Sequence, residues 1–165
     1  QAAGARDVIE LHGGLDLVVC LDCGRRDTRT ALDERLRLAN VDFVAAVAAI
    51  NPDGDAELSD AELDGFVAVG CGYCASDRLK PDVVFFGENV PRARVDACYG
   101  MVEAASALLV LGSSLTVMSG LRFVRRAAAL GIPIAIVNQG ETRGDPLATI
   151  KIDAPLGELL TALAE

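Results

Sequence analysis

The chain of 165 residues contains no tryptophan, and aromatic residues make up only 4% of it. It also lacks an excess of positive charge, because 24 acidic residues outnumber 15 Lys and Arg and give a net charge of −9. Nucleic-acid binding depends on basic side chains that neutralise phosphates, so we expect no direct nucleic-acid partner. The acidic balance either serves solubility alone or suits a basic partner, such as a lysine-rich protein segment.

Long apolar runs are missing as well. Each one is interrupted by Gly, Pro or a charge before it reaches the roughly 18 residues that span a bilayer, so we expect no membrane partner. Residues 1–6 lack the apolar core of a secretory signal. Five cysteines, an odd number, without an export signal indicate a reducing, cytoplasmic location in which thiols bind metal or catalyse.

What is present in the second half of the chain is an alternation of continuous apolar strands with helices. This pattern is typical of an α/β fold whose parallel sheet is covered on both faces. Ligands bind such sheets at the carboxyl ends of the strands. The expected strands are 83–86, 107–111, 132–137 and 150–152, and the expected helices are 91–105, 119–130 and one that starts at Pro155.

The first half reads as an insertion. Apolar residues at helical spacing predict a helix within 30–50. Residues 51–55, Asn-Pro-Asp-Gly-Asp, predict a turn, and the capping-box pattern of residues 59–62 predicts the start of a short helix.

Two Cys-x-x-Cys pairs, Cys20 with Cys23 and Cys71 with Cys74, flank this insertion. Two thiolates three positions apart can hold one metal through a tight turn, and two such turns complete a tetrahedron. A site with four sulfurs has no open position, so a zinc ion there would be structural. The alternatives are unrelated pairs of reduced, buried cysteines or a redox motif. The fifth cysteine, Cys98, is expected in the core.

His12 is the only histidine. A lone histidine is more often structural than catalytic. Two glycines follow it, however, and let a second backbone or a ligand come close. Histidine is also the side chain best suited to move protons near neutral pH.

Two turns after predicted strands are candidate ligand sites. Gly112, Ser113 and Ser114 offer backbone N–H groups and hydroxyls for a phosphate or ribose, although an ordinary turn is an equal alternative. Asn138, followed by Gln139 and Gly140, could bind a ribose diol. Both turns lie on the same edge of the predicted sheet.

Together these residues resemble the sirtuin family, class II in particular. The motifs that carry the resemblance are Glu-Leu-His-Gly at 10–13, the cysteine pairs, Lys-Pro-Asp-Val-Val-Phe-Phe-Gly-Glu at 80–88, Gly-Ser-Ser-Leu at 112–115 and Ile-Val-Asn at 136–138.

The resemblance implies an NAD-dependent protein-lysine deacylase with a structural zinc. His12 would be the general base that deprotonates the NAD ribose, and the products would be deacylated lysine, nicotinamide and O-acyl-ADP-ribose. Cofactor-binding residues would be Gly112, Ser113, Ser114, Asn138, Gln139, Gly140 and Leu156. Residues Val84, Phe86, Gly87 and Glu88 would pair with the acyl-lysine peptide, and Cys20, Cys23, Cys71 and Cys74 would hold the zinc.

The implied architecture is a Rossmann-like domain of residues 1–14 and 81–165, with residues 15–80 as the inserted zinc module. The family's glycine-rich Gly-Ala-Gly-Ile-Ser segment and its Gln-Asn-x-Asp segment do not occur, so the sheet lacks N-terminal strands. We therefore expect feeble NAD binding and incomplete catalysis by this chain. The other functions considered are an inactive zinc-stabilised interaction module and a protein ADP-ribosyltransferase. The oligomeric state stays open.

Overall fold

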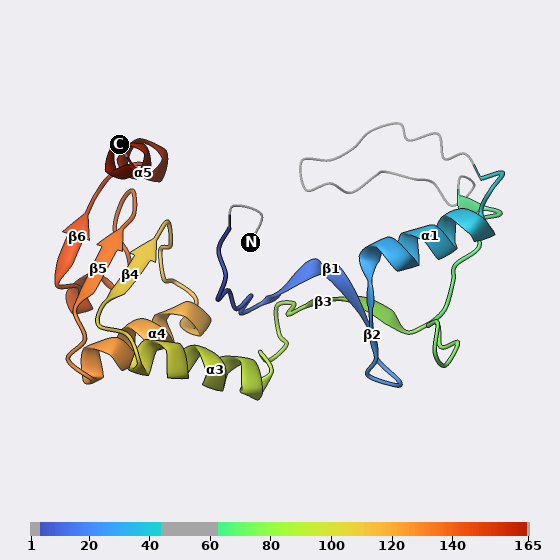
Figure 1. Ribbon diagram of the computed structural model, residues 1–165, viewed down its shortest axis with the longest axis horizontal. Helices are drawn as coiled ribbons and strands as arrows, with labels where there is room; N and C mark the ends of the chain where they lie inside the picture. The colour runs from blue at the N-terminus through green and yellow to red at the C-terminus, as the bar shows by residue number, and fades with distance from the viewer. Residues whose placement is uncertain (1–3, 44–62, 165) are drawn as a thin grey trace. The chain divides into compact units, whose positions relative to one another are not determined.

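The computed structural model describes residues 4–43 and 63–164 (Figure 1). Contacts divide the chain into two compact units, His12–Phe86 on one side and Gln1–Leu11 with Gly87–Glu165 on the other. The turn and the capping box expected at 51–55 and 59–62 lie outside the described residues. No helix in the described part of the chain is long and apolar enough to cross a membrane.

The unit of residues 12–86 contains an antiparallel sheet in the order β2-β1-β3. Its strands and helix are β1 (Gly13–Cys20), β2 (Arg26–Thr28), α1 (Arg29–Ala39) and β3 (Leu79–Val83). Helix α1 begins at Arg29 because the Thr28 hydroxyl accepts a hydrogen bond from the Ala31 N–H at 3.1 Å. The predicted helix within 30–50 is thus confirmed as far as α1 extends.

Gly13 makes the closest backbone contact of this sheet. It has a φ of +79°, and a Cβ at this position would lie 1.8 Å from the carbonyl oxygen of Asp82. Only glycine allows both. Next to it, the Val84 N–H donates to the carbonyl oxygen of His12 at 2.8 Å. The close backbone approach expected beside His12 therefore occurs at Gly13.

The prediction of a buried strand at 83–86 is wrong. Strand β3 ends at Val83, it pairs with β1 and not with the parallel sheet, and the side chains of Phe85 and Phe86 are 50% and 101% exposed. The apolar run suggested burial, but β1 begins at Gly13 opposite Val83, and in the described residues the pairing ends with the hydrogen bond from Val84 to His12.

The other unit contains the expected parallel sheet, in the order β4-β5-β6. Its elements are α3 (Arg92–Glu103), β4 (Leu108–Leu111), α4 (Met118–Ala129), β5 (Ile134–Val137), the short 3₁₀ helix η1 (Asp145–Leu147), β6 (Ile150–Ile152) and α5 (Leu156–Ala164). The predicted α/β class is confirmed, and each of these strands and α-helices matches an expected segment to within a few residues.

The core of this unit lies between the sheet and helices α3 and α4, which run together below the strands in Figure 1. Its buried residues are Val102, Leu115, Leu121, Val124, Ala127, Ile134 and Ile136. The prediction that the sheet is covered on both faces is wrong for β4, because Leu109 and Leu111 are 59% and 40% exposed. Among the described residues only the face of Leu108 and Val110 packs against the core cluster.

Candidate metal centre and nucleotide-binding edge

Two turns with the same hydrogen-bond pattern carry the paired cysteines; we call residues 20–24 the first knuckle and residues 71–75 the second. The Gly24 N–H donates to the carbonyl oxygen of Cys20, and the Ala75 N–H donates to that of Cys71, both at 2.9 Å. Each knuckle closes on a residue with positive φ, +69° at Gly24 and 60° at Ala75. The chain therefore builds the same metal-binding turn twice, from segments far apart in sequence.

The four cysteine sulfurs lie within 4.8 Å of one another. The Cys20 and Cys74 sulfurs are 3.6 Å apart, and those of Cys23 and Cys71 are 3.7 Å apart. A tetrahedral zinc with Zn–S bonds of about 2.3 Å requires S···S separations of about 3.8 Å, whereas a disulfide bond measures about 2.05 Å. The sulfurs are thus free thiols positioned to bind a zinc ion, and four of them leave no open coordination position.

Backbone N–H groups in the knuckles favour the thiolate form that a metal needs. The hydrogen bond from the Cys23 N–H is the largest cause that lowers the pKa of Cys20 to about 6. The Tyr73 N–H lowers the pKa of Cys71 in the same way. At Cys74 the Ser76 N–H also lowers the pKa, but burial and the neighbouring sulfurs outweigh it and raise the pKa to about 12.

Sequence reasoning missed the residues that tie the knuckles together. Asp22 of the first knuckle contacts two residues that follow the second knuckle. Its carboxylate accepts a hydrogen bond from the Ser76 hydroxyl and forms an ion pair with Arg78 at 2.6 Å. A carboxylate between two metal-binding thiolates is repelled by them and needs a donor nearby, which is the signal that could have pointed to this link.

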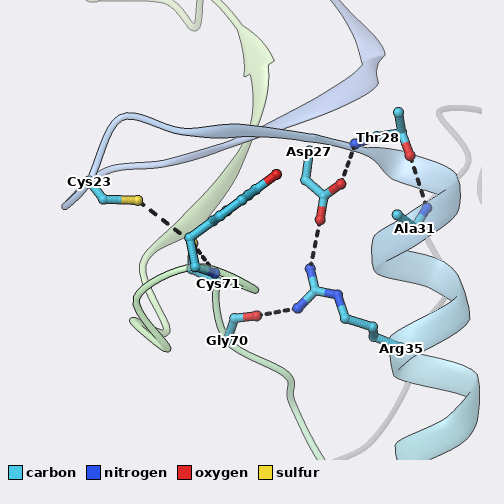
Figure 2. Close-up of polar contacts among 8 residues, drawn as sticks. Cys23, Asp27, Thr28, Ala31, Arg35, Gly70 and Cys71 are labelled. Carbon is cyan, nitrogen blue, oxygen red and sulfur yellow. Dashed lines mark hydrogen bonds and ion pairs between the residues drawn. The ribbon is translucent and has the colours of Figure 1, made fainter.

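Arg35 of α1 makes a second link (Figure 2). Its guanidinium donates to the carbonyl oxygen of Gly70, the residue before Cys71, at 2.5 Å and to the Asp27 carboxylate at 3.3 Å. Gly72 also lies against it, since a Cβ there would be 3.8 Å from the Arg35 guanidinium carbon. Helix α1 is thus attached through Arg35 to the residue before Cys71.

Gly112, at the carboxyl end of β4, lies against the start of α5. Its N–H donates to the Val137 carbonyl oxygen at 2.9 Å, which keeps the ends of β4 and β5 together. Its φ is +59°, and a Cβ there would meet Leu156 Cδ1 at 2.5 Å. The backbone conformation here therefore requires glycine. The structure also brings together Gly112 and Leu156, two of the predicted cofactor residues.

The serines that follow Gly112 have hydroxyls on the same edge. The Ser113 hydroxyl accepts from the Leu115 N–H at 3.2 Å, and the Ser114 hydroxyl lies 3.0 Å from that of Thr116. A hydroxyl with one such partner keeps further hydrogen-bonding capacity, so both can also bind a phosphate or ribose oxygen.

The second turn of this edge, residues 138–140, is stabilised by one of the chain's few lysines. The Lys151 ammonium donates to the carbonyl oxygens of Asn138 and Gly140 at 3.1 and 2.8 Å. The side-chain amide of Asn138 donates to the carbonyl oxygens of Gln139 and Gly140. Nothing in the sequence singled out Lys151, yet this side chain stabilises the turn that is predicted to bind a ribose. The two turns, residues 112–114 and 138–140, therefore share the carboxyl edge of one parallel sheet, and their role in cofactor binding stays a prediction.

The remaining predicted residues divide between the units. His12 is exposed in the turn before β1, and Val84 and Phe86 belong to the same unit. Gly87, with a φ of +90°, and Glu88 open the other unit. Their roles in catalysis and substrate binding stay predictions.

A parallel sheet with a glycine-serine edge and a four-cysteine metal centre in one chain define an α/β protein with a zinc-binding module. The model of the Sir2 family matches residues 1–119, and the chain belongs to this family. It is 57% identical over 165 residues to NAD-dependent protein deacetylase 1 of Streptomyces coelicolor, covering 100% of this chain and 55% of that protein. It is also 52% identical to NAD-dependent protein deacetylase 1 of Mycobacterium avium, and the match covers 99% of this chain and 58% of that protein.

A solved structure of Sir2 with p53 peptide and NAD⁺ is similar to the chain with a TM-score of 0.70 and 28% identity, covering 98% of this chain and 55% of that one. A structure of a Sir2 protein bound to a propionylated peptide gives a TM-score of 0.72 at 28% identity, covering 98% and 56%. The chain thus spans about half the length of the relatives it matches.

Proposed function

We propose that this chain carries the zinc module, the general base and the adenosine-binding edge of an NAD-dependent protein-lysine deacylase. The observation that supports this most is the match to the deacetylase of Streptomyces coelicolor, at 57% identity across the full 165 residues. The described residues that support the proposal are the glycine-serine sheet edge, the four clustered sulfurs and the exposed histidine.

NAD, when bound, would supply the ribose that accepts the acyl group. One water is consumed as the nicotinamide–ribose bond and the amide bond of the acyl-lysine break, and nicotinamide, deacylated lysine and O-acyl-ADP-ribose are released. Gly112, Ser113 and Ser114 would bind its phosphate and ribose oxygens. Residues 138–140 would hold the adenosine ribose, and Leu156 would contact the adenine. His12 would accept the proton from the ribose hydroxyl through a ring nitrogen, as a general base does.

Zinc takes no part in the chemistry, since four sulfurs fill a tetrahedral shell and leave no position for water. Its part is structural, within a module of residues 15–80 inserted into the Rossmann-like domain of residues 1–14 and 81–165. Thiolate ligands remain reduced in the cytoplasm, where we place the protein.

The acyl-lysine substrate pairs with the segment of Val84, Phe86, Gly87 and Glu88. An extended peptide can bind there through main-chain hydrogen bonds, which are indifferent to most side chains of the substrate. The exposed ring of Phe86 offers apolar contact beside the acylated lysine.

The test is His12→Ala in the longest form of the protein, assayed for NAD-dependent removal of acetyl from an acetyl-lysine peptide. We expect turnover to fall by about 10² to 10⁴, the usual effect of losing a general base, with zinc content and NAD binding retained. Asp16→Ala, at an exposed residue of β1, is the matched control. Unchanged turnover in the His12 variant would contradict the assignment. A mass increase on the acceptor protein would indicate ADP-ribosyl transfer, and no NAD binding by calorimetry would indicate a docking module.

A further inference from the structure

A cavity of about 410 Å³ lies along helices α3 and α4, and its lining residues are Tyr99, Glu103, Arg122, Arg125 and Arg126. None of them belongs to the edge of Gly112 and Asn138. We propose that this cavity binds a phosphomonoester dianion carried by a small molecule. The inference is independent of the proposed deacylase activity.

The spacing of residues on α4 directs the arginines into the cavity. Leu121, Val124 and Ala127 are buried in the core, with exposed fractions of 1%, 1% and 0%. Arg122, Arg125 and Arg126 line the cavity instead, three and four positions apart, which brings them onto one face of the helix.

The opposite wall is provided by α3. The ring of Tyr99 packs edge-to-face on Phe123 of α4, with centroids 5.0 Å apart. This contact fixes the tyrosine ring at the cavity, so its hydroxyl group is a donor held by packing and not by a flexible stem.

The charges of the cavity do not cancel. Arg126 forms a two-nitrogen contact with one oxygen of Glu103, at 3.0 and 2.7 Å, which neutralises both residues. Arg122 donates only to the carbonyl oxygen of Met118, at 3.4 Å, and Arg125 lies 4.0 Å from the Met118 sulfur. Within the described ranges neither has a carboxylate partner, although the chain carries a net charge of −9. Two positive charges therefore remain uncompensated in one cavity.

A phosphomonoester fits these groups better than a carboxylate does. Guanidinium groups bind phosphate oxygens through paired N–H donors. The Cβ atoms of residues three apart on a helix lie about 5–6 Å from each other, so the two long side chains can meet at one tetrahedral anion. A phosphomonoester has a charge of about −1.5 to −2 near neutral pH, which matches the two free arginines. A single carboxylate would leave one of them unpaired.

The experiment is equilibrium dialysis of the zinc-loaded protein against radiolabelled inorganic phosphate, with phenyl phosphate and benzoate as competitors. We expect saturable binding from which phenyl phosphate displaces the label and benzoate does not. Arg122→Gln combined with Arg125→Gln should weaken binding by tenfold or more, because a charged hydrogen bond contributes about 1.5–3 kcal/mol and tenfold corresponds to 1.4 kcal/mol.

Arg29→Gln combined with Arg92→Gln is the control, since it removes the same charge from two exposed i,i+4 pairs elsewhere. It should bind phosphate as the parent protein does. No saturable binding, equal loss in both double variants, or displacement by benzoate as effective as by phenyl phosphate would each overturn the proposal.

Discussion

The two units of this chain differ in the interactions that stabilise each of them internally. In the described part of residues 87–165, nine hydrophobic residues are buried: Val95, Val102, Leu115, Leu121, Val124, Ala127, Ile134, Ile136 and Val137. In the described part of residues 12–86 the buried ones are Val18, Cys20 and Cys71, two of which are metal-binding candidates. Among the described residues, one unit has an apolar core, and the other buries little besides its cysteine sulfurs.

The polar contacts of the cysteine unit do not replace a core. Two of its ion pairs, Arg26 with Asp82 and Arg78 with Asp22, have at least one largely exposed partner, and such pairs contribute about 0–1 kcal/mol each. Burial of apolar surface is the main favourable term in folding. We therefore expect the cysteine unit to depend more on a bound metal for its stability than the parallel-sheet unit does.

The largest expected effect is that of Cys71→Ser. Loss of one ligand opens the tetrahedron, and structural zinc contributes on the order of 10 kcal/mol to folding. We expect the variant to lose its bound zinc and to expose the unit of residues 12–86 to proteolysis. Zinc is measured by elemental analysis after dialysis.

Cys98→Ser is the matched control for that variant. Cys98 lies in α3, outside the cluster, and burial raises the pKa of its thiol, so it is a poor metal ligand. A control that lost as much zinc as the Cys71 variant would show that the four-sulfur site is wrongly assigned.

The second effect tests the other unit. Leu121 is 1% exposed in the core cluster, and Leu→Ala in a core costs about 2–5 kcal/mol. Leu121→Ala should lower the denaturant midpoint of the parallel-sheet unit while the bound zinc stays the same. Leu38→Ala, at a position 71% exposed in α1, should change the midpoint little. If zinc were lost with Leu121→Ala, the two units would not be independent in stability.

A smaller effect distinguishes the two knuckles. Ala75 has a positive φ of 60° where the first knuckle has Gly24, and the left-handed region costs a non-glycine residue about 1–2 kcal/mol. Ala75→Gly should therefore tighten zinc binding, and Gly24→Ala, in open space, should weaken it by a similar factor of about 5 to 30. Competition with a chromogenic zinc chelator measures both. Changes of the same sign in the two variants would refute the αL account.

The smallest effect is a pH dependence in the parallel-sheet unit. Hydrogen bonds from the Thr142 hydroxyl and then the Thr142 N–H lower the pKa of Asp145. A carboxyl whose pKa is lower in the folded state stabilises the fold above its unfolded pKa of about 3.9, and this is lost as pH falls through the folded pKa. Asp145→Asn should thus be less stable than the parent protein at neutral pH, with the difference shrinking in acid. Urea denaturation of both proteins at neutral and at acidic pH measures this difference. A difference in stability that does not change with pH would argue against the linkage to Asp145.

The sequence predicted what depends on local pattern. Apolar runs next to glycine located β4 and β5, and Cys-x-x-Cys spacing predicted sulfurs that the structure brings within 4.8 Å. It failed where the outcome depends on a distant partner. The run at 83–86 looked like a buried strand because its composition cannot show that β1 begins opposite Val83. Residues that act through single long side chains, such as Arg35 and Lys151, carry no periodic signal, so only the structure reveals them.

The most direct test of the central contrast is amide hydrogen exchange of the chain with zinc bound and after removal of zinc by a strong chelator. We expect protection to collapse in β1, β3 and α1 on metal removal, while β4, β5 and α4 keep theirs. Equal loss of protection in both units, or unchanged protection in β1 and β3 without metal, would contradict the account that the metal and the apolar core stabilise separate halves of this chain.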